Sequence, residues 1–150
     1  MAVAKWWREK TGGNCVLLIG PVEAERGGSA RLREHCVAVS DLTLSQVSAI
    51  LVRSDLYLGN DSGMSHLAAA LGTVTVALFG PTDPTQWSPR GRSVTVLSRH
   101  VDCSPCSSSS MKQCSHRRCL SEITPEDVIA AITHLFELGS LTRCGARIRV

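Results

Sequence analysis

Residues 55–72 decide the fold of this chain, and they read Asp-Leu-Tyr-Leu-Gly-Asn-Asp-Ser-Gly-Met-Ser-His-Leu-Ala-Ala-Ala-Leu-Gly. Residues 55–58 form a short apolar run that is typical of a strand. Residues 67–71 are strong helix formers, and Gly72 stands where a helix would end. A small polar loop lies between them. This order of strand, loop and helix points unpaired backbone N–H groups at an anion.

A second strand followed by a loop comes directly after the first. Residues 73–79 read as a strand and lead into the tight polar turn Gly-Pro-Thr-Asp-Pro at residues 80–84. Two such loops in succession indicate a ligand site at one edge of a parallel sheet. His66 falls in the first turn of the intervening helix, where its ring can reach an anion held by the loop.

The rest of the chain alternates between the two kinds of element. We expect helices over residues 2–10, 22–35, 43–53 and 124–138, and further strands over residues 15–19, 36–39 and 94–97. Either Thr43 or Ser45 can cap the third of these helices. Alternating strands and helices predict an α/β fold, with a Rossmann-like parallel sheet flanked by helices.

Two segments are expected to lack regular structure. The four serines at residues 107–110 predict a flexible loop. Residues 141–150 are expected to be a disordered basic tail, which leaves residues 1–140 as the folded domain.

Composition excludes several classes of protein. The 150 residues suit one domain, and 43% of them are hydrophobic, which is enough for an ordinary core. A net charge of +3 is too small to argue for nucleic-acid binding. The sequence has neither a bilayer-spanning apolar segment nor a signal peptide at its start. We therefore expect a cytoplasmic protein whose seven cysteines are reduced thiols or metal ligands and form no disulfides.

The two loops resemble the glycosyltransferase family that includes the ADP-heptose:lipopolysaccharide heptosyltransferases. That family's pattern is an Asp, a small residue, Gly, two residues and His, then Leu-Ala-Ala-Ala-Leu-Gly, a strand, and Phe-Gly-Pro-Thr-Asp-Pro. Here the pattern is matched by Asp61, Ser62, Gly63 and His66, by residues 67–72 and by residues 79–84. Trp87, Pro89 and the later cysteines also fit, so the resemblance runs from about residue 6 to about residue 138.

The resemblance implies the carboxy-terminal, donor-binding half of a two-domain GT-B glycosyltransferase. The first strand of that half and the whole amino-terminal acceptor domain would then lie upstream. The parent enzyme would be bacterial and would transfer heptose, or a similar sugar, from a nucleoside diphosphate such as ADP to a lipopolysaccharide core acceptor. The family's catalytic carboxylate belongs to the amino-terminal domain. We therefore assign no catalytic residue and expect the chain to be inactive alone.

The resemblance also implies that the enzyme needs no cofactor and binds no nucleic acid. We expect the enzyme in the cytoplasm, where it could associate peripherally with the inner face of the cytoplasmic membrane.

The expected donor site is built on the first loop. The backbone N–H groups of Ser62, Gly63 and Met64 would face the phosphates, and His66 would donate a hydrogen bond. Asp61 would accept a hydrogen bond from a sugar hydroxyl. A purely structural alternative stays open, in which Asp61 caps the helix and His66 packs beside it.

Two further positions are candidates for donor binding. Glu23 follows the strand at residues 15–19 and can bind ribose hydroxyls, although it can equally be an ordinary acid in a first helical turn, and Glu25 competes for the role. Thr82 can touch the donor sugar or its phosphate together with Asp83. Alternatively, the segment is a rigid turn in which Asp83 stabilises its own backbone.

A cysteine array leaves a different function open. Its four members are Cys103, Cys106, Cys114 and Cys119, and the spacing of the first pair suits zinc. The alternative, which we favour, is a loop of reduced thiols without metal. If zinc is bound, these four are the ligands, and the chain reads instead as a zinc-ribbon-like module. Such a module would contact nucleic acid or another anionic partner through Arg117, Arg118 and the basic tail.

Overall fold

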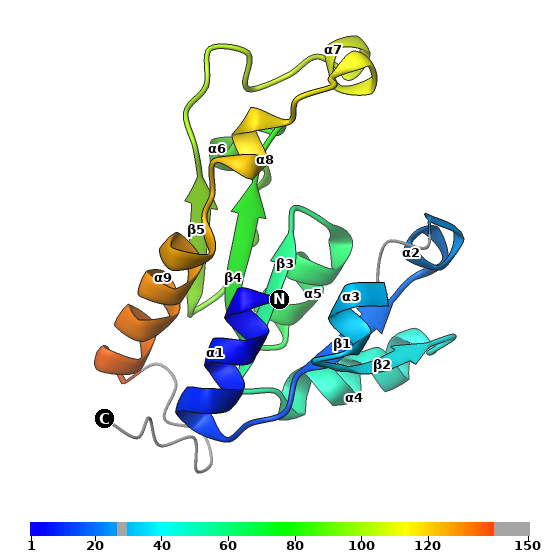
Figure 1. Ribbon diagram of the computed structural model, residues 1–150, viewed down its shortest axis with the longest axis vertical. Coiled ribbons are helices and arrows are strands. Elements are labelled where there is room, and N and C mark those ends of the chain that lie inside the picture. The colour runs from blue at the N-terminus through cyan, green and yellow to red at the C-terminus, as the bar shows by residue number, and fades with distance from the viewer. Residues whose placement is uncertain (27–29, 140–150) are drawn as a thin grey trace.

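The computed structural model describes residues 1–26 and 30–139 (Figure 1). The strands are β1 (Val16–Ile19), β2 (Val37–Ser40), β3 (Leu56–Asn60), β4 (Val74–Phe79) and β5 (Val94–Ser98). The longer helices are α1 (Ala2–Thr11), α4 (Leu44–Arg53), α5 (Gly63–Ala70) and α9 (Pro125–Glu137). The shorter ones are α2 (Pro21–Arg26), α3 (Ala30–Arg33), α6 (Pro84–Trp87), α7 (Ser108–Gln113) and α8 (Arg118–Ser121).

The strands are parallel and helices flank them, which confirms the expected Rossmann-like α/β class. Within the described residues they form two sheets, one with the order β1-β2 and one with the order β3-β4-β5. Figure 1 shows α1 and α9 in front of the strands and α4 and α5 behind them. The single continuous sheet expected from the alternating pattern is therefore divided between β1 and β3.

β4 is the most deeply buried strand, because it lies between β3 and β5 and contacts both α5 and α9. Its side chains meet the apolar faces of α1 and α9, and the Trp7 and Phe136 rings pack with centroids 5.7 Å apart. The buried residues of this core are Trp7, Val74, Val76, Val128, Ile132 and Leu135. The fold therefore depends on the three-stranded sheet and the two helices that cover one of its faces.

Helix ends agree with the sequence signals. α4 begins at a capping box in which the Thr43 hydroxyl accepts from the Gln46 N–H, which settles the choice between Thr43 and Ser45. α9 begins with the same device, formed by Thr124 and Asp127 with a proline in the first turn. α1 ends at Gly12, whose φ of 71° is the left-handed conformation that glycine adopts without strain.

Several local predictions were wrong or incomplete. The serine-rich segment predicted as a flexible loop is helical over Ser108–Gln113, because the Ser107 hydroxyl caps it by accepting from the Ser110 N–H. The short helices α6 and α8 were not predicted. The helix predicted over residues 22–35 is divided into α2 and α3, and residues 27–29 between them lie outside the described residues, as do residues 140–150, where the basic tail was expected.

No helix in the described ranges combines the length and the apolar character that crossing a bilayer requires.

The core around β4 and α9 gives a stability prediction. Ile132 is fully buried, so Ile132→Ala should lower the free energy of unfolding by about 2–5 kcal/mol. Leu138 is 64% exposed just beyond α9, so Leu138→Ala should cost less than about 0.5 kcal/mol. Urea denaturation of the three proteins measures both effects, and equal losses would contradict this description of the core.

Candidate functional site

The junction between β3 and α5 exposes backbone donors. The Asp61 N–H donates to the Leu78 carbonyl at 3.1 Å, which fixes the end of β3 against β4. The N–H groups of Ser65 and His66 then donate to the Ser62 carbonyl at 3.1 and 3.4 Å. The N–H groups of Gly63 and Met64 belong to the first helical turn and have no helical carbonyl before them. They point out of the start of α5.

Ser65 holds this junction in place, a role that the sequence reasoning missed. Its side chain is completely buried, and its hydroxyl donates to the Asn60 carbonyl at 2.5 Å. This bond ties the first turn of α5 to the last residue of β3. The available signal was a second serine, at position 65, just before His66 and the apolar run of residues 67–71.

Asp61, Ser62, Gly63 and His66 all lie at the start of α5, but no side chain among them caps the helix. The N-cap residue is Ser62 rather than Asp61, and its side chain makes no capping hydrogen bond. His66 is exposed on the first turns of α5, and Asp61 is half-buried. The alternative in which Asp61 caps the helix is therefore not observed.

Gly63 leaves open space in front of the exposed donors. A Cβ atom added to Gly63 would meet no atom within 4 Å. By contrast, a Cβ atom on Gly91 would lie 2.7 Å from the Ala69 carbonyl oxygen. A ligand can therefore approach the backbone at Gly63 closely, because glycine carries no side chain there.

The second loop lies at the same sheet edge as the first. β3 and β4 are parallel neighbours with Asn60 opposite Leu78, so residues 61–62 and 80–83 leave the sheet on the same side. The Thr82 hydroxyl is buried and, within the described part of the chain, has no hydrogen-bond partner. A buried hydroxyl without a partner is uncommon and marks Thr82 as a candidate for ligand contact.

Asp83 has a local partner. Its carboxylate accepts from the Thr85 N–H and the Thr85 hydroxyl, each at 2.8 Å, and so caps α6. This agrees with the reading in which Asp83 stabilises its own turn.

Glu23 lies in α2, directly after β1 and the turn at Gly20. Its side chain falls outside what the structure describes, so its candidate role and that of its competitor Glu25 stay predictions.

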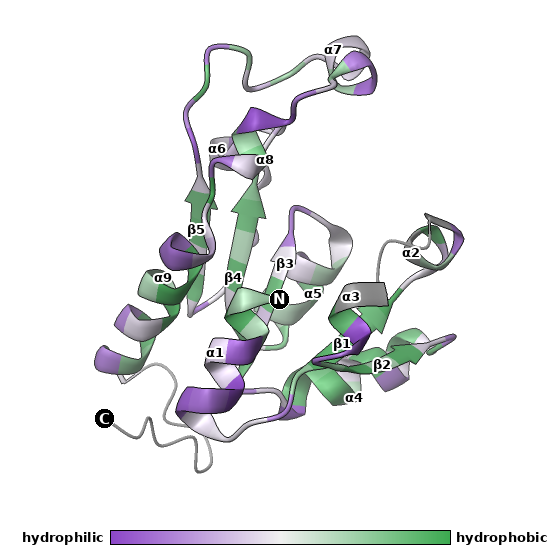
Figure 2. Ribbon diagram, viewed as in Figure 1, coloured by the Kyte–Doolittle hydropathy of each residue, from purple (hydrophilic) through white to green (hydrophobic). Residues whose placement is uncertain are grey.

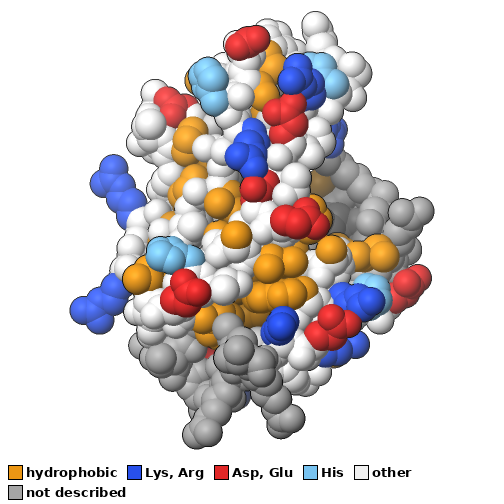
Figure 3. Space-filling model, turned by 60° about the vertical axis from the view of Figure 1, so that its left-hand side comes forward, with side chains coloured by type: hydrophobic (Ala, Val, Ile, Leu, Met, Phe, Trp, Pro, Cys, Tyr) orange, Lys and Arg blue, Asp and Glu red, His pale blue; other side chains and the backbone are white. Residues whose placement is uncertain are grey.

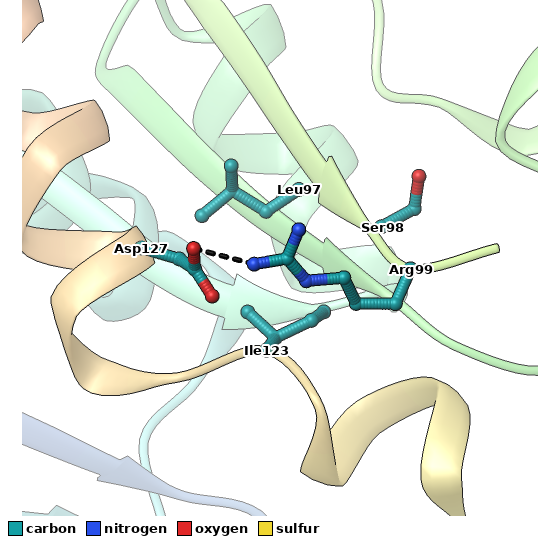
Figure 4. Close-up of a pocket in the computed structure, with 5 residues that line it drawn as sticks. All are labelled: Leu97, Ser98, Arg99, Ile123 and Asp127. Atoms are coloured by element: carbon teal, nitrogen blue, oxygen red, sulfur yellow. Dashed lines mark ion pairs between the residues drawn. The ribbon is translucent and has the colours of Figure 1, made fainter.

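A small pocket lies away from these loops, where β5 ends and α9 begins (Figure 4). Its lining residues are Leu97, Ser98, Arg99, Ile123 and Asp127. Arg99 and Asp127 pair across it at 2.5 Å, and Arg99 also donates to the Glu122 carbonyl. Because Arg99 and Asp127 already bind each other, this ion pair holds the end of β5 against the start of α9.

The same contacts make Asp127 sensitive to pH. The Thr124 backbone N–H, and after it Arg99, hold the pKa of Asp127 below its ordinary value. Because the folded-state pKa is lowered, the interaction stabilises the fold above the ordinary carboxyl pKa and is lost as pH falls through the folded value.

The four cysteines of the array lie in the segment beyond β5, where Cys103 and Cys106 precede α7, Cys114 ends α7 and Cys119 lies in α8. Burial, and after it the neighbouring Cys103, Cys119 and Cys114 thiols, raises the pKa of Cys106 above its ordinary value. The Cys106 thiol donates to the Cys103 carbonyl at 2.9 Å, and Cys119 is buried. In residues 1–26 and 30–139, no group of three or more His, Cys, Asp or Glu side chains is arranged to hold a metal ion.

Comparison with known proteins places these loops in a family. Residues 3–116 match the sequence profile described as Glycosyltransferase family 9 (heptosyltransferase). A lipooligosaccharide heptosyltransferase 2 from Campylobacter jejuni is 33% identical over 117 residues, which cover 73% of this chain and 36% of that protein. A lipopolysaccharide heptosyltransferase 1 from Pseudomonas aeruginosa is 34% identical over 67% of this chain and 31% of its own length.

Solved structures agree in fold. A family 9 glycosyl transferase from Veillonella parvula superposes with a TM-score of 0.72 at 25% identity, over 91% of this chain and 40% of that one. The E. coli ADP-heptose lps heptosyltransferase II gives a TM-score of 0.71 at 23% identity over the same shares. The chain thus spans about a third of the length of the curated relatives it matches.

The cysteines give a second prediction. We expect no stoichiometric zinc after purification without added metal, and free thiols at all four positions of the array. Because its pKa is raised, Cys106 should react more slowly with iodoacetamide near neutral pH in the folded chain than in the urea-unfolded chain, since less of it is thiolate. Elemental analysis and mass-mapped alkylation test this. One zinc per chain with four protected thiols would show that the array is a metal site.

Proposed function

The chain belongs to glycosyltransferase family 9, and on that basis we propose that it is the donor-binding part of an enzyme transferring heptose, or a similar sugar, from a nucleoside diphosphate to a lipopolysaccharide core acceptor. The observation that carries this is the β3–α5 junction, where first-turn N–H groups face open space inside the family-matched segment. The relatives are heptosyltransferases of lipooligosaccharide or lipopolysaccharide, which supports the sugar and the acceptor.

The junction suits a diphosphate for electrostatic reasons. The N–H groups of Ser62, Gly63 and Met64 would bind phosphate oxygens, and the positive end of the α5 dipole would favour their charge. The same groups would stabilise the nucleoside diphosphate as it leaves the sugar, which requires no divalent metal. His66 would add a hydrogen bond from the side chain.

The remaining donor contacts are assigned by position. Asp61 would accept from a sugar hydroxyl, and the unpartnered Thr82 hydroxyl would reach the donor from the second loop. Glu23 would bind the ribose hydroxyls from the end of β1. No catalytic base is assigned to this chain, because the base would come from an amino-terminal domain that also binds the acceptor.

We propose that the enzyme acts in the cytoplasm, with room for peripheral association at the inner face of the cytoplasmic membrane. No cofactor and no nucleic-acid partner belong to this proposal.

The alternative of a zinc-ribbon-like nucleic-acid module gains no support from a specific observation. On the face drawn in Figure 3, basic and acidic side chains are interspersed, without a continuous basic patch of the kind that binds phosphate backbones.

The His66 assignment can be tested by calorimetric titration with ADP. His66→Ala should weaken binding by about 1–2 kcal/mol, the value of a hydrogen bond to an anion. The control is His134→Ala, since His134 is exposed on α9 and its nearest ion-pair partner is Glu137 at 3.8 Å. Equal affinities of the wild-type and His66→Ala proteins would remove His66 from the site.

Gly63→Ala tests the backbone donors themselves. Because the added Cβ meets nothing within 4 Å, the fold should be unaffected and thermal stability equal or slightly higher. The Cβ would occupy the space through which phosphates approach, so affinity for ADP should fall at least about tenfold, or about 1.4 kcal/mol. Adenosine, which lacks phosphates, should bind both proteins equally. Unchanged ADP affinity would place the phosphates elsewhere.

A further prediction concerns turnover. The chain alone should not transfer sugar at an enzymatic rate, because it offers a donor site without an acceptor domain or base. An assay with ADP-heptose and a deacylated core acceptor measures this. Robust turnover would mean that the chain itself contains the base.

A further inference from the structure

Two cysteines that the proposed function does not use stand at the start of neighbouring strands. Cys15 directly precedes β1, and Cys36 directly precedes β2. The strands are parallel with Val16 opposite Val37, and the Val37 N–H donates to the Cys15 carbonyl at 2.8 Å, so the two cysteines occupy matching positions. Neighbouring strands lie about 4.8 Å apart, within the Cα separation of about 4.4–6.8 Å that a disulfide spans.

The two thiols lie on the same face of this sheet and interact. The Cys15 thiol is half-buried and donates to the Ala4 carbonyl of α1 at 3.8 Å, which places it on the face that α1 covers. Burial, and after it the charge of Cys36, raises the pKa of Cys15, and a hydrogen bond between the two thiols acts in the same direction. Because the thiols already contact each other, side-chain rotation can bring the sulfurs to bonding distance without a backbone movement.

A guanidinium lies beside this pair of thiols. Arg8 on α1 donates to the carbonyl of His35, the residue before Cys36, at 2.5 Å. Against the larger effects of burial and of the Cys36 charge, the Arg8 charge lowers the pKa of Cys15. A cation in this position favours a thiolate in the pair. The Cys36 charge raises the pKa of Cys15, so ionisation of Cys36 leaves Cys15 protonated, and the two thiols are suited to different steps.

The cysteine array beyond β5 has a different environment. The Cys106 thiol donates to the Cys103 carbonyl. Burial, and after it the neighbouring thiols, raises the pKa of Cys106, and no cation in the described part of the chain acts against them. The pair formed by Cys15 and Cys36 therefore combines two thiols in contact with a nearby positive charge, a combination that favours oxidation of this pair.

We propose that Cys15 and Cys36 form an oxidation-sensitive site, which a peroxide converts into a disulfide between the starts of β1 and β2. The Cys36 thiolate attacks one peroxide oxygen and breaks the O–O bond, which leaves a sulfenic acid on Cys36 and releases hydroxide. The Cys15 thiol then attacks the Cys36 sulfur, and the sulfenic oxygen leaves as water with the proton of Cys15. The two sulfurs together lose two electrons and the peroxide gains them. A small dithiol reverses the change by thiol–disulfide exchange.

The disulfide stabilises an exposed part of the fold. Among the strands that the structure describes, β2 pairs with β1 alone, and Val37 is 60% exposed although Figure 2 shows both strands as mostly hydrophobic. A bond between residues 15 and 36 closes the segment that carries α2 and α3, which restricts the unfolded chain. Oxidation therefore raises the stability of the β1–β2 sheet. No part of this inference depends on the proposed function.

The test is oxidation of the full chain by hydrogen peroxide, followed by tryptic digestion and mass spectrometry. Digestion places Cys15 in peptide 11–26 and Cys36 in peptide 34–53, and neither peptide contains another cysteine. The monomer should yield the two peptides joined and lighter than their sum by two hydrogen atoms. Its melting temperature should rise by at least about 4 °C and return after dithiothreitol. Absence of the joined peptides, or their presence in covalent dimers alone, overturns the proposal.

Serine variants separate this pair from general oxidation of thiols. Cys36→Ser should abolish the rise in melting temperature, whereas the matched control Cys106→Ser should retain it. In Cys15→Ser the sulfenic acid on Cys36 has no thiol to resolve it, so dimedone should label it at least about tenfold more than it labels Cys15 in Cys36→Ser. Disulfides from either peptide to the array would overturn the pairing, and equal dimedone labelling would overturn the assignment of Cys36 as the attacking thiol.

Discussion

The parallel pairing of β3 with β4 is the constraint on which the candidate site depends. The bond from the Asp61 N–H to the Leu78 carbonyl closes this pairing at the point where β3 gives way to a loop. Because the strands are parallel, the loop before α5 and the loop that carries Thr82 emerge at one edge. The buried Ser65 hydroxyl then fixes the start of α5 against Asn60. The exposed donors of the first turn are thus held in place before any ligand arrives.

Much of this arrangement follows from the sequence. The apolar run before Asn60, the small residues of the loop and the helix formers after His66 predict the strand, the turn and the helix. Thr124 and the proline after it likewise predict the start of α9. These signals are reliable because each is local: a capping hydroxyl or an apolar run determines its own few residues.

The features that the sequence did not predict depend on spatial neighbours or on ambiguous local patterns. The role of Ser65 depends on the Asn60 carbonyl lying within reach of its hydroxyl. The helix after Ser107 was missed because a run of serines suits a loop as well as a capped helix. The division of the sheet depends on which strands are neighbours in space, and alternation of strands and helices along the chain does not fix that. Asp83, by contrast, caps α6 through a local contact, as one of the two sequence alternatives expected.

In the proposed function, the β3–α5 junction binds the diphosphate of a nucleotide through backbone N–H groups. The most direct measurement is a titration of the isotope-labelled chain with ADP, followed by amide chemical shifts, with adenosine as the comparison. We expect ADP to move the amide signals of Ser62, Gly63 and Met64 downfield, as hydrogen bonding to phosphate does, and adenosine to leave them in place. Shifts from ADP that spare these three amides and fall instead around Arg99 and Asp127 would contradict it.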